Sequence, residues 1–441
     1  MTSHRFIEAI RDLDLASRTG RIVRILPTFV EADGPNVPVG AICEIETRPT
    51  LGRSSVALAE VVSVLPNSVI LAPFEDGPAT YSGARVMATA RVGRAPVGDA
   101  FSGRAIDALG RPIDGGPPVE AERWVSLSPI PTSPLSRATS SAALETGLKT
   151  IDGLLTIGVG QRVGIFAASG VGKTTLMTQL ATQVQADRCI VCLVGERGRE
   201  VESFWSRGVS RFAKRKMTLI SATSDESAAM RVRAAEFALC LADYWRSQGE
   251  QVLLMLDSVT RLAMAMRQIG LAAGEPPTMR AYTPSVFAAI PRLVERCGAL
   301  KTGGSITAFM TVLSETDEID DPISELMKSL LDGHIVLSRA LAEQGHFPAI
   351  DVPRSVSRLA FDLHSDERRG EVERAVGLLS TYDASRTLIE TGMYSPGASA
   401  EIDRAIELRP ALAGFMKQKP GERVPIQETC RALGAILAEG G

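Results

Sequence analysis

The segment AASGVGKT, residues 167–174, constrains the fold more than any other part of the sequence. It follows the apolar run RVGIF and precedes a helical pattern. It fits the template of a phosphate-binding P-loop, except that alanine stands in place of the first glycine. Gly170 and Gly172 let the backbone turn so that successive N–H groups converge on phosphate oxygens at the N-terminus of a helix. This order of strand, glycine-rich turn and helix predicts a nucleotide site.

The sequence around this segment predicts an α/β core. From about residue 150 to residue 358, apolar runs alternate with amphipathic stretches, which predicts a mostly parallel sheet covered by helices on both faces. The strand-like runs are RVGIF, CIVCLV, MTLIS, QVLLMLD, SITAFMTVL and HIVLS, and the helical stretches include 175–186, 227–248 and 285–297.

Further domains are expected on both sides of this core. Short β-rich runs from Gly20 to about Arg91 are typical of a small antiparallel barrel or sandwich. The passage GDAFSGRAIDALGRPIDGGPP is interpreted as ordered turns that link two domains, and helices are expected after Leu359. We therefore predict an N-terminal amphipathic helix within 1–19, a β-barrel over 20–91, a P-loop core over 92–360 and a helical C-terminal domain over 361–441.

The N-terminal helix is predicted from residues 5–15, which place apolar side chains on one helical stripe with charges opposite. Such a stripe usually packs on its own domain, and docking of a partner is the alternative. The stripe consists of Phe6, Ile7, Ile10 and Leu13.

Charge and hydropathy exclude several classes of protein. Lysine and arginine number 48 and aspartate and glutamate 51, for a net charge of −3, so the chain has no overall basic footprint for nucleic acid or an anionic membrane. No apolar run approaches the roughly 20 residues of a membrane span. The N-terminus also lacks the apolar region of a secretory signal. We expect a soluble chain of the cell interior.

The six cysteines do not form a disulfide framework in a chain of 441 residues. Cys189 and Cys192 make a C-x-x-C, but they lie in the strand-like run CIVCLV with no second Cys or His pair nearby. Residues three apart on a strand point to opposite faces and cannot share a metal. We interpret both as buried reduced thiols.

Two carboxylates follow core strands and complete the candidate chemistry. Lys173 is placed to reach the β- and γ-phosphates, and the Thr174 hydroxyl and Asp257, which ends the run VLLMLD, are placed to hold Mg²⁺. Glu196 lies in GERGRE after CIVCLV, where it can orient and deprotonate an attacking water. A solvated charge cluster is the alternative for GERGRE.

These motifs, in this order, resemble the flagellar and type III secretion export ATPases, relatives of the catalytic subunit of rotary ATP synthases. The match runs from about Gly20 into the C-terminal domain, and its most specific segment is PAIDVPRSVS at 348–357. Stretches similar to the export branch are VGDAFSGRAIDALGRPIDG, ATSDESAAMRVRAAEFA, RQIGLAAGEPPTMRAYTPSVFAAIPRLVER, DGHIVLSRALAEQGHFPAIDV and GMYSPGASAEIDRAI.

The resemblance implies a role for each matching residue. Glu196 aligns with the catalytic carboxylate and Arg197 follows it, while Arg358 falls where the family has the arginine finger that completes a neighbouring subunit's site. Phe347 occupies the position of an aromatic ring that packs on adenine. The implied catalytic set is Lys173, Glu196, Arg197 and Arg358; the nucleotide set is Ser169, Gly170, Val171, Gly172, Lys173, Thr174, Thr175 and Phe347; and the metal set is Thr174 and Asp257.

Two alanines depart from the family pattern. Ala168 stands where relatives generally have glycine in the phosphate loop, and Ala281 does so in the segment 270–287, which resembles the loop that lines the central pore or faces a stalk. A rigid surface loop is the alternative for that segment. If either position requires a positive φ, alanine costs stability or shifts the loop. We therefore expect an active but slower site.

As a function, the resemblance implies a homohexameric ATPase that uses ATP and Mg²⁺ at subunit interfaces to release, unfold and export substrates. Implied partners are a stator-like regulator, a stalk protein, an export gate, substrates and chaperones, with no nucleic acid. The implied location is the cytoplasm, at the inner-membrane export apparatus, with peripheral membrane association. Alternatives are a virulence (injectisome) system, a rotary ATP synthase subunit, a non-catalytic nucleotide-binding subunit and an RNA translocase. The retained Lys173, Glu196 and Arg358 disfavour the non-catalytic alternative.

Overall fold

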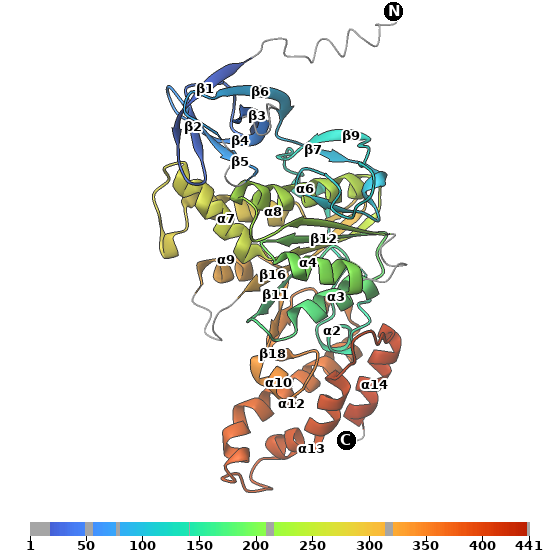
Figure 1. Cartoon of the computed structure of the whole chain (residues 1–441). Coiled ribbons are helices and arrows are strands. Elements are labelled where there is room, and N and C mark those ends of the chain that lie inside the picture. Colours follow the sequence, from blue (N-terminus) through green and yellow to red (C-terminus); the bar gives the residue numbers. More distant parts are fainter. Residues whose placement is uncertain are drawn as a thin grey trace, which may run out of the picture.

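A computed structural model of the chain describes residues 18–48, 56–75, 80–140, 142–208, 216–313 and 321–438. In these residues a closed barrel, a large sheet flanked by helices and a helical C-terminal region follow one another along the long axis of the molecule (Figure 1). This arrangement confirms the predicted fold class. The helix predicted over 5–15 lies outside the described residues.

The barrel closes in the strand order β1-β2-β5-β4-β3-β6, with antiparallel neighbours throughout. In β4 the small apolar residues Ala57, Ala59 and Val61 alternate into the barrel interior, as a period of two requires. The strands are β1 (Thr19–Ile25), β2 (Val30–Ala32), β3 (Ala41–Glu46), β4 (Val56–Val64), β5 (Val69–Pro73) and β6 (Arg85–Val92).

The core sheet has the order β18-β17-β11-β16-β14-β12-β13-β8, in which all neighbours from β17 to β8 are parallel and β18 is antiparallel. The short strands β10 (Arg137–Ala138) and β15 (Gly298–Leu300) join it beside β16, and β7 (Arg94–Val97) pairs with β9 (Arg123–Ser126). The main strands are β8 (Ala105–Asp107), β11 (Arg162–Ala167), β12 (Arg188–Val194), β13 (Met217–Ala222), β14 (Gln251–Asp257), β16 (Ser305–Leu313), β17 (Gly333–Leu337) and β18 (Ile350–Ser357).

Both edge strands of this sheet differ from the sequence-based expectation. The passage interpreted as linking turns contains β8, whose three residues are too few for a periodic signal. The segment IDVPRSVS, which carries Pro353, forms β18. Proline lacks a backbone donor and is tolerated in an edge strand, so its presence does not prevent this pairing.

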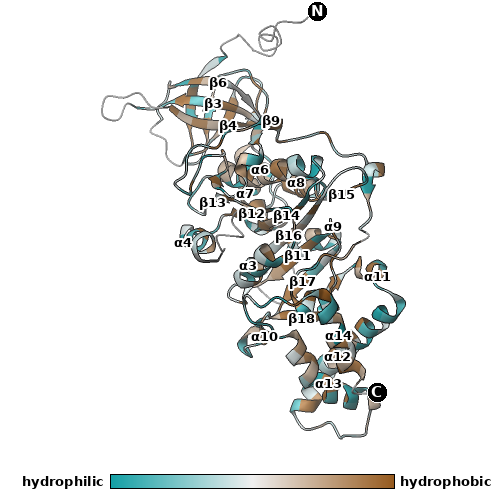
Figure 2. Cartoon of the chain, turned by 90° about the vertical axis from the view of Figure 1, so that its right-hand side faces the viewer, coloured by the Kyte–Doolittle hydropathy of each residue, from teal (hydrophilic) through white to brown (hydrophobic). Residues whose placement is uncertain are grey.

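Helices cover both faces of the sheet (Figure 2), as predicted. One apolar cluster joins Phe166 and Cys192 to α6, α7 and α8; the other joins Ile165 and Cys189 to α3 and the C-terminal helices. The helices are α2 (Lys149–Leu154), α3 (Lys173–Gln183), α4 (Gly198–Ser203), α6 (Ala228–Ser247), α7 (Val259–Ala272), α8 (Pro284–Glu295), α9 (Pro322–Leu330), α10 (Arg339–Glu343), α11 (Ala360–Leu363), α12 (Asp366–Glu390), α13 (Ala400–Met416) and α14 (Ile426–Ala438).

The two cysteines of the C-x-x-C therefore lie on opposite faces of β12, and both are buried and free. The interpretation of Cys189 and Cys192 as core thiols is confirmed. Burial raises the pKa of the Cys189 thiol to about 12. Within the described parts of the chain, no helix combines the length and apolar character that crossing a membrane requires.

Candidate nucleotide-binding site

The P-loop connects the end of β11 to the start of α3. Gly170 and Gly172 adopt φ of +83° and +92°, in the left-handed region where a side chain would be strained. Gly172 is also the N-cap of α3 and offers no side-chain acceptor to the first turn. The N–H groups of that turn are therefore free to bind an anion.

Lys173 brings the predicted site residues together. Its Nζ lies 2.5 Å from Asp257 Oδ1 and 3.4 Å from Glu196 Oε1. Asp257 ends β14 and Glu196 follows β12. Parallel strands present their carboxyl ends at one edge of the sheet, so these side chains meet the P-loop there.

Thr174 and Asp257 offer oxygen ligands of the kind that Mg²⁺ prefers. Asp257 is buried and also accepts a hydrogen bond from Thr311 Oγ1 at 2.6 Å, which fixes the carboxylate, while Thr174 is exposed on the first turn of α3. Among the described residues no group of three or more His, Cys, Asp or Glu side chains is placed to hold a metal. A Mg²⁺ ion bound mainly through water and phosphates needs only one or two protein ligands, so the pair fits that ion.

Glu196 is only 5% exposed and is surrounded by cations. Arg261 Nη1 lies 2.5 Å from its Oε1 and also donates to the carbonyl oxygen of Gly195 at 2.8 Å. Burial would raise the pKa of Glu196. The hydrogen bond from Arg261, the charge of Lys173 and a hydrogen bond with Glu200 outweigh burial and lower that pKa. Glu196 is therefore ionised at neutral pH.

Glu200 lies beside Glu196, and its pKa shifts in the opposite direction. Its pKa is raised, first by the hydrogen bond to Glu196 and then by burial. Sequence reasoning missed both Arg261 and Glu200. Spacing offered a signal for each, because Glu200 lies four residues after Glu196 and Arg261 lies four residues after Asp257.

Phe347 lies at the open side of the P-loop. A Cβ atom placed on Gly172 would be 3.4 Å from its ring, and the residue is 43% exposed. The carbonyl oxygen of Phe347 accepts a hydrogen bond from the backbone of Gln418 at 2.9 Å, which ties it to the segment between α13 and α14. The adenine-stacking role stays a prediction, and the position of the ring is compatible with it.

The other predicted residues divide into two groups. Ser169 and Thr175 are exposed around the loop, Val171 is buried beneath it, and Arg197 is exposed at the N-cap of α4, next to Glu196. Arg358 lies apart from all of these residues, at the other end of the sheet.

The strand register shows where Arg358 lies. It follows Ser357, which pairs with Gly333, which in turn pairs with Val163 near the start of β11. The P-loop begins at the other end of this six-residue strand, about 16 Å further along at ~3.3 Å per residue. The chain does not bring Arg358 to its own P-loop.

The two unusual alanines have different backbones. Among the described residues, the non-glycine positions with positive φ are Arg280 at 50° and Ala281 at 59°. Ala168 is outside the left-handed region, so the backbone argument for a slower site does not apply to it. The argument applies to Ala281, which ends the short helix η4 (Met279–Ala281) between α7 and α8.

Fold and site together define a P-loop protein of the rotary ATPase type. Residues 147–357 match the nucleotide-binding domain of the ATP synthase alpha/beta family. Residues 364–435 match the T3SS EscN ATPase C-terminal domain.

More specific similarity covers nearly the whole chain. It is 42% identical over 436 residues to a flagellum-specific ATP synthase of Bacillus subtilis, covering 99% of each chain. It is 39% identical to a type 3 secretion system ATPase of Xanthomonas euvesicatoria, covering 96% of this chain and 95% of the relative. The structure of the assembled ATPase EscN from the enteropathogenic E. coli type III secretion system superposes with a TM-score of 0.89 at 39% identity, covering 95% of this chain and 100% of the chain in that structure. EscN was also solved in complex with its central stalk EscO.

The chain belongs to the family of flagellar and type III secretion ATPases. It is an ATPase of protein export.

Proposed function

We propose that this chain hydrolyses MgATP at the interfaces of a homohexameric ring and thereby drives release, unfolding and export of substrates. The observation that carries the proposal is the separation of Arg358 from its own P-loop along the full length of β11. An exposed arginine at one end of the sheet and an incomplete phosphate site at the other suit a head-to-tail ring. Each subunit then supplies its Arg358 to a neighbour's site.

In this proposal, Glu196 orients a water molecule for in-line attack and accepts its proton. The lowered pKa of Glu196 keeps the carboxylate ionised, and Arg261 holds it in place. Lys173 moves its contact from Asp257 to the β- and γ-phosphate oxygens, and a neighbour's Arg358 neutralises the charge that develops there. A bound Mg²⁺, held by Thr174 and through water by Asp257, would add positive charge beside the same oxygens. Phe347 stacks on adenine, and Arg197 adds positive charge beside Glu196.

The same proposal includes the partners and the location. A stalk protein faces the segment 270–287 from the centre of the ring, and the complex of assembled EscN with its central stalk EscO supports such a partner. A stator-like regulator, an export gate, substrates and chaperones are the further partners, and the site of action is the cytoplasmic face of the inner membrane. The relatives include both flagellar and type 3 secretion ATPases at similar identity, and the proposal covers both kinds of apparatus.

The first test is the ATPase activity per subunit across a wide range of protein concentration, with particle size measured in parallel. A site completed by a neighbour predicts that activity per subunit rises with the fraction of rings. Full activity in particles of monomer size would contradict the proposal. No activity in assembled rings would favour a non-catalytic nucleotide-binding subunit.

A further inference from the structure

Arg358 makes two contacts, one with the last turn of α9 and one with the segment that joins α9 to β17. Its backbone N–H donates to the carbonyl oxygen of Asp332 at 2.9 Å. Its Nη2 donates to the carbonyl oxygen of Lys328 at 3.2 Å, in the last turn of α9. The guanidinium is otherwise exposed. The positions of Lys328 and Asp332 therefore set the starting point from which the arginine extends toward a neighbouring subunit.

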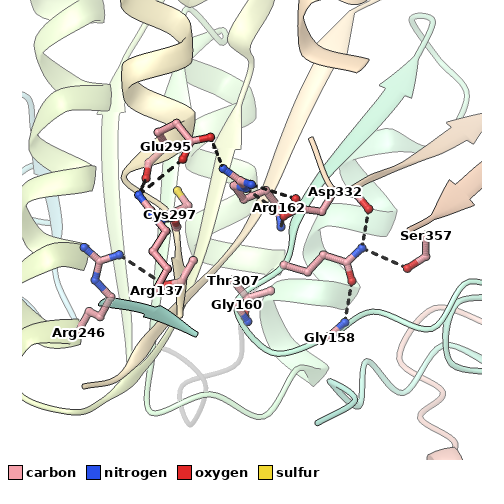
Figure 3. Close-up of polar contacts among 12 residues, drawn as sticks. Arg137, Gly158, Gly160, Arg162, Arg246, Glu295, Cys297, Thr307, Asp332 and Ser357 are labelled. Carbon is pink, nitrogen blue, oxygen red and sulfur yellow. Dashed lines mark hydrogen bonds and ion pairs between the residues drawn. The ribbon is translucent and has the colours of Figure 1, made fainter. Parts of the chain in front are cut away.

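Asp332 is itself held by the first residue of β11. Arg162 donates to both carboxylate oxygens at 2.9 Å, through Nε and Nη2, and its backbone N–H donates to Oδ2 at 3.0 Å (Figure 3). This fork geometry fixes both the distance and the plane of the carboxylate. The hydrogen bonds that Arg162 donates to Asp332 raise its own pKa further, so the arginine stays charged at all pH values of interest.

A buried glutamine contacts residues on both sides of the same junction. Gln161 is fully buried, and its Nε2 donates to the carbonyl oxygen of Asp332 at 3.0 Å and to Ser357 Oγ at 3.1 Å. Ser357 immediately precedes Arg358. Gln161 therefore contacts both Ser357, the residue before Arg358, and Asp332, whose carbonyl oxygen accepts the hydrogen bond from the Arg358 N–H.

Arg162 has a further carboxylate partner. Its Nη1 lies 2.7 Å from Oε1 of Glu295, the last residue of α8, and Arg137 contacts the same glutamate (Figure 3). Three of the guanidinium nitrogens of Arg162 are thus engaged by two acids from different elements. A lysine in its place would keep the charge and lose the fork.

We propose that Asp332, held by Arg162, is a positioning residue for Arg358 and sets the geometry with which this arginine enters a neighbouring site. The inference rests on the proposed function, in which Arg358 acts between subunits. A purely structural role is the competing explanation, because the same ion pair also joins β11 to β17, and β11 leads into the P-loop.

Mixed rings separate the two explanations. One chain carries Lys173→Ala and donates an intact Arg358, and the other carries Arg358→Ala and keeps an intact P-loop. Their mixture recovers activity where the first chain's arginine meets the second chain's P-loop. Asp332→Asn, which keeps the shape and removes the charge, is then added to one chain or to the other.

We expect Asp332→Asn to reduce the recovered activity roughly 10- to 100-fold on the arginine-donating chain, as a misplacement of about 1 Å does. On the Arg358→Ala chain it should have no effect, since there is no arginine to position. Asp114→Asn is the matched control, because it breaks a similar bidentate pair with Arg104 far from Arg358 and should leave the recovery unchanged from either chain.

The outcomes are distinct. An equal loss from both chains, or no loss from either, overturns the inference and leaves the proposed function standing. No recovery in the parent mixture contradicts the action of Arg358 between subunits, and the inference falls with it. Arg162→Lys is the second variant if Asp332→Asn does not fold, and the Km for ATP should be unchanged in either.

Discussion

At the scale of single residues, the site is a balance of charges around Lys173. One ammonium group faces Asp257 and Glu196, and the Arg261 guanidinium faces Glu196 from the other side. Glu200 holds a proton more readily than an ordinary glutamate does, because it is hydrogen-bonded to Glu196. An incoming phosphate therefore competes with Asp257 for Lys173, while Arg261 keeps Glu196 in place.

Replacement of Glu196 tests its role as the base. Glu196→Gln should lower turnover by roughly 10²- to 10⁴-fold, the usual contribution of a general base, while ATP still binds. Single-turnover hydrolysis and equilibrium binding of a fluorescent nucleotide measure the two properties separately. Glu202→Gln, on the exposed side of α4, is the control and should keep both. Loss of ATP binding in Glu196→Gln would contradict the assignment.

The acid side of the pH–rate profile should depend on Arg261. As the proposed base, Glu196 acts when ionised, and the hydrogen bond from Arg261 is the largest contribution that lowers its pKa. Without it, burial dominates and the pKa rises, so Arg261→Ala should move the acid limb of kcat/KM to higher pH. Profiles between pH 5 and 8 check this, with Arg267→Ala on the same helix as the control. An unmoved limb would show that Arg261 does not control ionisation of Glu196.

At the scale of elements, the loop between α7 and α8 carries backbone strain. Arg280 and Ala281 both have positive φ, and an L-residue pays about 1–2 kcal/mol for this conformation. The strand–loop–helix of the nucleotide site needs positive φ at Gly170 and Gly172, where glycine is present. The nucleotide loop thus avoids the strain of positive φ by using glycine, whereas the loop between α7 and α8 retains that strain at Arg280 and Ala281.

Ala281→Gly should relieve part of this strain, and Ala168→Gly should not. The backbone N–H groups of residues 281 and 282 donate to the carbonyl oxygens of Thr278 and Met279. We expect amide hydrogen exchange at these two residues to slow by about fivefold in Ala281→Gly, because relief of ~1 kcal/mol of strain makes local opening less favourable by that factor. Ala168→Gly should give no protection and no faster single-turnover hydrolysis. Unchanged exchange in Ala281→Gly would remove the argument for strain.

At the scale of the whole molecule, a partly buried ionic cluster joins the barrel to the core. Glu60 on β4 lies 3.7 Å from Arg233 on α6, and Arg233 Nη2 donates to the carbonyl oxygen of Arg94 at 2.7 Å. The Arg233 guanidinium also lies over the ring of Phe74. Burial, with the nearby charge of Glu236, raises the pKa of Glu60 to about 7.

This raised pKa makes the stability of the junction depend on pH. Between the ordinary glutamate pKa and about 7, the folded state binds a proton that the unfolded state has lost, so stability falls as pH rises through this window. Glu60→Gln should flatten that fall, with a difference on the order of 1 kcal/mol. Thermal unfolding at pH 5 and pH 7.5 measures it, and Glu44→Gln, on a neighbouring barrel strand, is the control. Equal pH dependence of wild type and Glu60→Gln would contradict the assignment.

The sequence by itself determined the features that depend on short-range patterns. Turn geometry and helix-terminus chemistry allow the P-loop to be predicted from eight residues. The period of two along a strand places Cys189 and Cys192 on opposite faces. The alternation of strands and helices predicts the parallel core, and parallel strands ending at one edge explain why Asp257 and Glu196 both reach Lys173.

Only the tertiary structure decided what depends on contacts between distant segments. The three residues of β8 carry no periodic signal, and their strand pairing comes from β13. The contact of Arg261 with Glu196 requires α7 to pack beside the end of β12. The ion pair between Arg162 and Asp332 joins residues that are 170 positions apart in the sequence. The separation of Arg358 from its own P-loop follows from strand register, which no local pattern encodes, because register is set by the packing of the whole sheet.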